Sequence, residues 1–172
     1  MRHTFKTQLE LSEFFDNNPK FTGTITMLFP NGSKSKVVNY KNGRQNGKEQ
    51  EWYKNGVKAT VAYYKNERKH GPYKDWRNDG TIWEISNYQK DRFHGLRKLY
   101  HTNGKIHSKT NYYLGNFHGQ SQVWNEDGTK RMDVIYANGS FLNGHYYCDS
   151  ERSLKSYRKP NKTLALNFAI YT

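Results

Sequence analysis

Short runs of alternating apolar and polar residues, each ended by a tight-turn signal, fill most of the sequence. Gly47–Lys54 and Val57–Tyr64 are one example, with Asn55 and Gly56 between them. Alternation with a period of two is typical of strands that pack on one face. Asn-Gly between two such runs is the strongest short-range signal for a hairpin. The pattern therefore predicts an all-β chain built from β-hairpins.

The hairpin signal recurs every 24 residues, which is the signature of a repeat architecture. Each unit has a first glycine, a large residue five positions later, a second glycine nine positions later and a tyrosine seventeen positions later. The first glycines are Gly23, Gly47, Gly71, Gly95 and Gly119, and the large residues are Leu28, Trp52, Trp76, Tyr100 and Trp124. The second glycines are Gly32, Gly56, Gly80, Gly104 and Gly128, and the tyrosines are Tyr40, Tyr64, Tyr88, Tyr112 and Tyr136.

The residue before the second glycine predicts the turn inside each hairpin. It is always Asn or Asp, and Asn-Gly or Asp-Gly suits the positive φ angles of a type I′ turn with a two-residue loop. Such a loop places Gly47 opposite Tyr64, and it pairs the first glycine with the tyrosine in every unit. We expect each tyrosine ring to lie over that glycine and to help fix the register. A second turn, such as Asn42 with Gly43, links each hairpin to the next, and its type stays open.

Alternation assigns the side chains to two faces. The tyrosine face carries the tyrosine column together with Ile25, Met27, Val38, Tyr53, Ala62, Tyr73, Ile82, Leu99, Ile106, Val123, Met132 and Val134. The tryptophan face carries the column of large residues, with Val61, Trp83, Ile85 and Ile135 beside it. Neither face is cleanly polar. One face is therefore expected to be the packing surface, and the second aromatic row is either covered by the chain ends or exposed.

The two ends of the chain differ from the repeats. Residues 1–20 are predicted to form an N-terminal cap, in which Gln8–Asn17 is a short helix or an irregular segment. Residues 21–145 hold five to six repeats, and residues 146–172 hold a basic connector (Arg152–Lys162) and a capping strand (Thr163–Tyr171). Repeat arrays need atypical ends to cover their exposed edges. The expected fold is an elongated single-layer antiparallel sheet of about ten to twelve strands with short terminal caps.

Composition agrees with a thin sheet and raises a question about partners. Only 34% of the residues are hydrophobic while 16% are aromatic, and aromatic rings offer large apolar areas without a thick aliphatic core. The formal net charge is +13 and is spread along the chain, which favours a solvated surface. An acidic partner, such as anionic lipid headgroups, nucleic acid or an acidic protein, is the alternative.

The residue types that carry chemistry do not form a catalytic or metal-binding pattern. His70, His94 and His118 are 24 residues apart, so they lie two strands, or about 9–10 Å, from one another. One zinc ion needs its nitrogen ligands within about 2.1 Å, and the histidines are therefore expected to be polar turn residues. Glu49 and Glu51 are expected to be exposed, with ordinary pKa values.

The single cysteine, Cys148, has no evident base and no cleft, which a nucleophile requires. The sequence predicts no catalytic residue, no metal site and no cofactor, and hence a non-enzymatic protein. It contains no apolar run of 18 residues, and Met1–Lys20 does not have the pattern of a signal peptide. We therefore expect a cytoplasmic protein.

Residues 21–145 resemble MORN repeats. The resemblance rests on Asn46-Gly-Lys-Glu-Gln-Glu-Trp-Tyr-Lys-Asn-Gly56 and His70-Gly-Pro-Tyr-Lys-Asp-Trp-Arg-Asn-Asp-Gly80. The units lack the Tyr-x-Gly start of the usual consensus, so they are most similar to the variant form, which occurs in antitoxin-like bacterial proteins and in large-virus proteins. The resemblance implies an elongated twisted sheet. It also implies a binding or scaffolding role toward proteins and, in some members, toward membrane phospholipids.

The predicted function is a protein-interaction scaffold, with an antitoxin-like role as one form of it. Aromatic residues are enriched where proteins bind one another. The predicted partner-binding residues are Trp52, Trp76, Tyr100 and Trp124. Peripheral binding to anionic membrane phospholipids through the basic surface is the first alternative, and non-specific binding of nucleic acid is the second.

Overall fold

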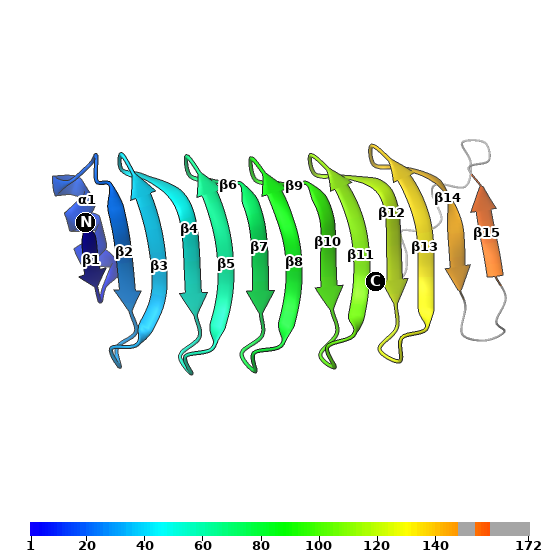
Figure 1. Cartoon of the computed structure of the whole chain (residues 1–172), viewed down its shortest axis with the longest axis horizontal. Helices are drawn as coiled ribbons and strands as arrows, with labels where there is room; N and C mark the ends of the chain where they lie inside the picture. Colours follow the sequence, from blue (N-terminus) through cyan, green and yellow to red (C-terminus); the bar gives the residue numbers. More distant parts are fainter. Residues whose placement is uncertain (148–153, 159–172) are drawn as a thin grey trace.

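The computed structural model describes residues 1–147 and 154–158, and it contains one open sheet in which the strands lie side by side in chain order (Figure 1). Fifteen strands belong to this sheet, in a single layer, and the helix α1 lies at its N-terminal end. The predicted all-β fold of successive hairpins is confirmed. The strands are β1 (Arg2–Phe5), β2 (Gly23–Leu28), β3 (Lys34–Lys41), β4 (Arg44–Trp52), β5 (Lys58–Lys65), β6 (Arg68–Lys69), β7 (Gly71–Trp76), β8 (Ile82–Gln89), β9 (Arg92–Phe93), β10 (Gly95–Tyr100), β11 (Ile106–Tyr113), β12 (Asn116–Trp124), β13 (Lys130–Ala137), β14 (Ser140–Tyr147) and β15 (Leu154–Arg158).

The five repeats form five hairpins with the predicted register. They consist of β2 with β3, β4 with β5, β7 with β8, β10 with β11, and β12 with β13. In each hairpin the first glycine pairs with the tyrosine, as Gly47 does with Tyr64. The other four pairs are Gly23 with Tyr40, Gly71 with Tyr88, Gly95 with Tyr112, and Gly119 with Tyr136.

The turn inside each hairpin is not the predicted type I′ turn. Between β4 and β5, the Gly56 N–H donates to the Tyr53 carbonyl (2.9 Å) and the Tyr53 N–H donates to the Val57 carbonyl (2.8 Å). Gly56 has a φ of 83°, whereas Asn55 does not have a positive φ. This is the three-residue loop in which a type I turn is followed by a glycine in the left-handed region. The Asn55 Oδ1 atom accepts from the Val57 N–H instead (3.1 Å), which stabilises the turn.

The register survives because a bulge compensates for the longer loop. Trp52 pairs with Lys58 whereas Glu51 pairs with Thr60, so Ala59 is an extra residue in β5. One additional residue in the loop is offset by one additional residue in the strand. The other four hairpins have the same shift. The pairing deduced from a two-residue loop is therefore right although the loop itself is different.

The type I′ turns lie between the hairpins. Lys41 pairs with Arg44, and the two residues between them, Asn42 and Gly43, have φ angles of 52° and 74°. Positive φ at both central residues of a two-residue loop defines this turn. The other link turns have the same property, and their central residues are Asn66 and Glu67, Lys90 and Asp91, Leu114 and Gly115, and Asn138 and Gly139.

The first glycine of a repeat is required by backbone conformation. Tyr40 pairs with Gln45 but Val38 pairs with Glu49, so β4 bulges around Gly47, where φ is 99°. A residue with a Cβ atom would be strained at this angle. The backbone angle explains why this position is a glycine without the predicted tyrosine ring lying over it. The equivalent angles are 107° at Gly71, 85° at Gly95 and 83° at Gly119.

The tyrosine face is the packing surface of the sheet. Every side chain of the five hairpins that is buried lies on this face by register, and Ile25 and Val134 are the largest that are fully buried. Most of the others are polar, because a single layer has no second sheet to supply an apolar cover. The buried residues of the hairpins are Ile25, Val38, Glu49, Ala62, Glu84, Ser86, Ser108, Thr110, Ser121 and Val134.

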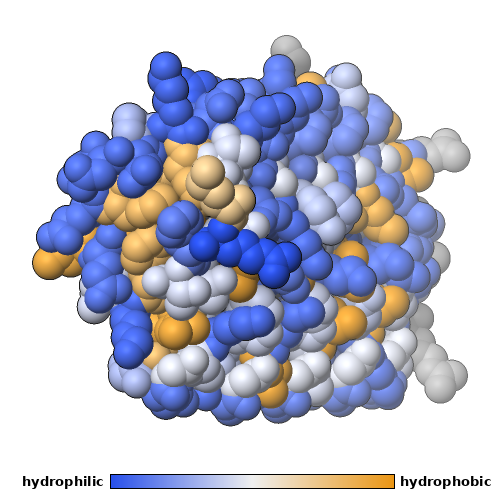
Figure 2. Space-filling model, turned by 60° about the vertical axis from the view of Figure 1, so that its left-hand side comes forward, coloured by the Kyte–Doolittle hydropathy of each residue, from blue (hydrophilic) through white to orange (hydrophobic). Residues whose placement is uncertain are grey.

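The N-terminal cap covers the first hairpin on the tyrosine face. The helix α1 (Gln8–Asn17) begins after Thr7, whose hydroxyl accepts from the Glu10 N–H (3.2 Å) in a capping box. The ring centroids of Phe15 and Tyr40 are 4.8 Å apart. Figure 2 shows apolar surface gathered at this end of the molecule. Strand β1 pairs with β2 in parallel, which corrects the expectation of a purely antiparallel sheet.

The C-terminal end continues the array by a sixth unit. Strand β14 contains Gly144, and β15 pairs with it in antiparallel orientation. The sequence predicts a connector over Arg152–Lys162, but Leu154–Arg158 is a strand. The predicted capping strand Thr163–Tyr171 and Cys148 lie outside the described residues.

The link turns predict a stabilising substitution. Lys90 is exposed and has a φ of 52°, and the equivalent residues Asn42, Asn66 and Asn138 are asparagines, which tolerate this region best after glycine. We expect Lys90→Asn to stabilise the protein by roughly 0.5–1 kcal/mol, measured from the midpoint of urea unfolding. The control is Lys90→Ala, which removes the same charge without relieving the backbone. An equal effect of both changes would show that the φ angle is not the cause.

Candidate binding surfaces

A ladder of rings in contact, tilted by 31–41° from one another, crosses the tyrosine face in the C-terminal half of the array. Its ring centroids are 4.6 Å apart between Tyr88 and Phe93, 5.1 Å between Phe93 and Tyr112, 5.1 Å between Tyr112 and Phe117, and 5.0 Å between Phe117 and Tyr136. Each tyrosine pairs across the link turn with the phenylalanine of the next unit. The ladder thus stabilises contacts between hairpins as well as within them.

The phenylalanines of this ladder form a fifth column that the predicted repeat pattern lacks. Phe21, Phe93 and Phe117 lie two positions before a first glycine, and Phe141 continues the 24-residue period three positions before Gly144. The period is visible in the sequence, but Gln45 and Lys69 interrupt it. The Gln45 side chain donates to Glu49 (2.6 Å), and the Lys69 ammonium lies 4.8 Å from the centre of the Tyr73 ring. The aromatic surface is therefore replaced by a polar one in the second and third hairpins.

Charged side chains on the tyrosine face neutralise one another. The Lys36 ammonium lies 2.8 Å from Glu49 and 2.9 Å from Glu51. Burial opposes the charge of Lys36, but these two contacts raise its pKa. Glu49 is only 5% exposed, which corrects the expectation that it is a surface residue. Burial and the charge of Glu49 also raise the pKa of Tyr64 to about 12.

A second buried pair lies in the middle of the array. The Arg97 guanidinium donates two hydrogen bonds to Glu84, at 3.0 and 2.8 Å. Two-point pairing of this kind fixes both side chains. Both buried carboxylates, Glu49 and Glu84, are thus already bound to a cation. They hold the face together and are not arranged as a free acid and base.

Asp75 pairs with Glu84 between β7 and β8, and it forms no ion pair within the described residues. Its carboxylate accepts a hydrogen bond from the Thr60 hydroxyl (3.0 Å). Burial raises the pKa of Asp75, and the negative charge of Glu84 raises it further. The ionised form of Asp75 therefore opposes folding.

The tryptophan face holds the four predicted partner-binding residues, and all four are partly buried. The Trp124 ring lies under the ammonium groups of Lys109 and Lys130, 5.5 and 5.8 Å from its centre. The large apolar side chains that are exposed on this face are different ones. By alternation they are Tyr63, Trp83, Leu96, Tyr113 and Ile135, with exposed fractions of 37–51%. Alternation already indicates their face, but the partial burial of the tryptophan column could not be predicted from the sequence.

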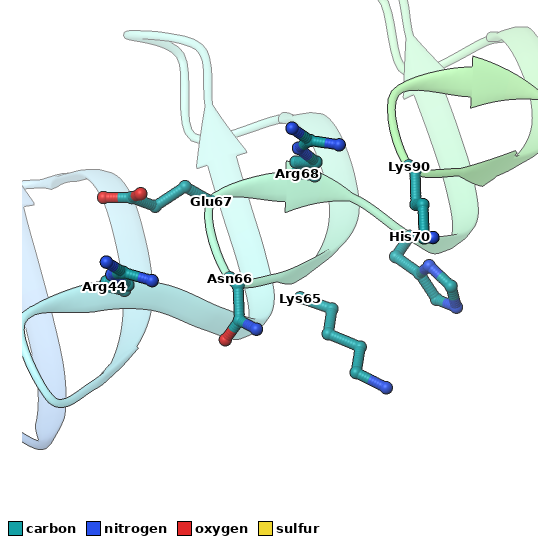
Figure 3. Close-up of a pocket in the computed structure, with 7 residues that line it drawn as sticks. All are labelled: Arg44, Lys65, Asn66, Glu67, Arg68, His70 and Lys90. Carbon is teal, nitrogen blue, oxygen red and sulfur yellow. The ribbon is translucent and has the colours of Figure 1, made fainter.

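The third surface is the side of the sheet at which the strands end in the link turns. It is called the link-turn edge below and is distinct from the outermost strands. It has two shallow depressions of about 470 and 750 Å³ that share Arg44, Lys65 and Asn66 and so run into each other. Figure 3 shows the first depression, with Glu67 as its single acidic side chain. The cationic side chains that line the two depressions are Lys20, Lys41, Arg44, Lys65, Arg68 and Lys90.

The three periodic histidines do not converge. His70 lines the first depression, whereas the rings of His94 and His118 lie on either side of Tyr113, at 5.5 and 5.8 Å. Within residues 1–147 and 154–158, no three His, Cys, Asp or Glu side chains are placed to hold one metal ion. In the same part of the chain, no helix is long and apolar enough to cross a membrane.

Comparison with known proteins supports the repeat assignment at two places. The family model described as MORN repeat variant matches residues 45–66 and 93–112, which cover the start of the second hairpin through its link turn and most of the fourth hairpin. MORN repeats are generally binding or scaffold modules, so a non-enzymatic binding role is consistent with this match. No curated protein matches the chain.

Among solved structures, the chain is similar to one described as the crystal structure of the GtfA/B complex bound to UDP and GlcNAc. The identity is 10% and the TM-score is 0.28, over 92% of this chain. The chain spans only 39% of the length of that protein. At this level of similarity, neither its fold nor its ligands bear on the chain described here.

The aromatic ladder predicts how Phe117 stabilises the protein. Phe117→Leu keeps the apolar character but removes stacking on Tyr112 and Tyr136, at about 0.5–1.5 kcal/mol for each pair. We expect a loss of roughly 1–3 kcal/mol in the free energy of unfolding, measured by urea denaturation. Phe117→Tyr, which keeps both ring contacts, is the control and should change little. A full-size effect of the tyrosine variant would rule out stacking as the cause.

Asp75 predicts a stability effect with a defined pH dependence. Its folded pKa lies above the ordinary value of 3.8, so ionisation opposes folding as the pH rises through and beyond that range. Asp75→Asn keeps an acceptor for Thr60 and removes the charge. We expect a higher melting temperature than wild type at pH 7, and a smaller difference at pH 3.

The matched control for this experiment is Asp133→Asn. Burial opposes the charge of Asp133, but hydrogen bonds from Lys130, Gln122 and Gln120 lower its pKa overall. Ionised Asp133 therefore favours folding, and its removal should lower the melting temperature at pH 7. If both variants moved the melting temperature in the same direction, the opposite roles of the two carboxylates would be refuted.

Proposed function

We propose that the protein is a non-enzymatic interaction scaffold that binds another protein through its tryptophan face. The observation that carries this proposal is the set of large apolar side chains exposed on that face over four successive hairpins. Contiguous apolar surface with a polar surround is typical of protein interaction sites. Aromatic side chains such as Tyr63 and Trp83 are enriched in the centres of such interfaces.

The arrangement of this face favours a macromolecular partner. Successive hairpins are two strands, or about 9.5 Å, apart, so the exposed side chains are distributed along the sheet and do not surround a single point. The two depressions of about 470 and 750 Å³ lie at the link-turn edge and not on this face. A flat, extended surface of this kind suits another protein better than a small molecule.

Lysines accompany the exposed apolar residues. Lys48 pairs with Tyr63, and Lys74 pairs with Ile85, so both lysines share the tryptophan face. Basic side chains around an apolar centre favour a partner with a complementary acidic rim. An antitoxin-like role, in which the scaffold occupies the surface of a partner protein, is the specific form of this function that the MORN-variant resemblance suggests.

The proposal is tested by capture from native host extract, followed by titration of the captured protein against purified variants. Tyr63→Ser combined with Leu96→Ser alters the tryptophan face, and Leu9→Ser on α1, which is 68% exposed, is the matched control. We expect the double variant to weaken binding by about tenfold or more, equivalent to the loss of contacts worth about 1.4 kcal/mol. Unaltered binding by a folded double variant would refute the tryptophan face as the interface.

A further inference from the structure

The link-turn edge repeats its positive charge with the period of the array. Arg44, Arg68 and Arg92 occupy the same position in three successive link turns, and the corresponding residues of the last two are Asn116 and Ser140. The basic character is therefore confined to the N-terminal part of this edge. The +13 charge of the chain, which looks evenly spread in the sequence, is locally concentrated by the fold.

These cations have no partner in the described part of the chain. The ion pairs between described residues involve Lys36, Arg97, His101 and Lys130, but none of the three arginines of this edge. All three are exposed, and so are Lys41 and Lys65 beside them. Six cations and a single carboxylate line the two depressions. The six positive charges repel one another, and an anionic ligand would reduce this repulsion.

The spacing of the cations indicates the shape of that ligand. Equivalent residues of successive hairpins are two strands apart, which is about 9.5 Å. A polyproline II helix has three residues per turn and rises about 3.1 Å per residue, so every third side chain returns to the same side after about 9.3 Å. An acidic residue at every third position of such a peptide would meet Arg44, Arg68 and Arg92 in turn.

The residues around the depressions favour a peptide over a nucleic acid. Single-stranded nucleic acids are bound by basic grooves that also contain aromatic platforms for the bases. Neither depression is lined by Phe, Tyr or Trp. The lining does include Asn42, Asn46 and Asn66, whose amides can donate to and accept from a peptide backbone.

We propose that the N-terminal part of the link-turn edge is a binding site for an extended acidic peptide segment with carboxylates at three-residue intervals. Each arginine pairs with one carboxylate of the peptide. Lys41, Lys65 and Lys90 add to the electrostatic attraction. Glu67, the one acidic side chain of the lining, opposes binding. This site goes beyond the proposed function, because it is a different surface from the tryptophan face and can be removed without altering that face.

The test uses a fluorescein-labelled (Glu-Pro-Pro)5 peptide and fluorescence anisotropy with the full-length protein at low and physiological salt. Arg44→Glu combined with Lys65→Glu removes the two cations shared by both depressions. The matched control is Lys34→Glu combined with Lys54→Glu, which changes the charge equally at exposed positions near the opposite edge. We expect wild type and control to bind alike, and the link-turn variant to bind at least about tenfold more weakly.

Two further variants keep the result interpretable. Glu67→Gln removes the one negative charge of the lining and introduces no new charge. It should strengthen binding by about twofold. Tyr63→Ser combined with Leu96→Ser should leave peptide binding unchanged, so that failure of this site and failure of the tryptophan face are separate results. Circular dichroism and the melting temperature establish that each variant is folded.

The peptide controls decide the chemistry of the ligand. A (Gln-Pro-Pro)5 peptide should not bind, and a (Glu-Ser)5 peptide, with the same number of carboxylates at two-residue spacing, should bind more weakly. Equal binding of the link-turn variant and its matched control would overturn the proposal. Tighter binding of a thymidine oligonucleotide, or of vesicles containing phosphatidylserine, that is lost in the link-turn variant would also overturn it, in favour of another class of ligand.

Discussion

The structure depends on one cross-strand pairing, that between the first glycine and the tyrosine of each repeat. The same register recurs in all five hairpins, as Gly47 with Tyr64 illustrates. It places every tyrosine on the same face, next to the link turn. A slip by one residue would move the whole set to the other face. The extra residue in the loop and the extra residue in the bulge must therefore occur together, because either alone would shift the pairing.

A single-layer sheet must stabilise its packed face without a second layer. In this protein, neighbouring side chains on the same face take over that role. Rings contact rings across the link turns, as Tyr88 does with Phe93, and the buried carboxylates of Glu49 and Glu84 are bound to Lys36 and Arg97. Each contact joins one strand to the next. The stability of the array therefore depends on contacts between neighbouring hairpins. The helix α1 completes the packing at the N-terminal end of the array, where Phe15 contacts Tyr40.

Because the packing contacts lie on the tyrosine face, two other surfaces are left for the proposed binding. Most of the tyrosine face is occupied by contacts within the protein, and five of the six large apolar side chains that are exposed on the described hairpins lie on the tryptophan face. The link turns project from one edge, and the arginines and lysines beside them form no ion pair within the described residues. The proposed protein interface and the proposed acidic-peptide site thus both consist of residues that take no part in the packing of the tyrosine face. They lie on different parts of the sheet and can be tested independently.

The sequence by itself determined the repeat, the hairpins and the register, because a 24-residue period and cross-strand counting depend only on local spacing. It could not determine the turn types, since Asn-Gly fits both a type I′ turn and a type I turn followed by a left-handed glycine. It also placed Glu49 on the surface, because burial depends on neighbours such as Lys36 that come from another hairpin. Only the tertiary structure showed that Phe93 stacks on Tyr112, that the tryptophan column is partly buried, and that Arg44, Arg68 and Arg92 line up along one edge. These properties arise from residues that are far apart in the sequence and approach one another only when the strands are laid side by side.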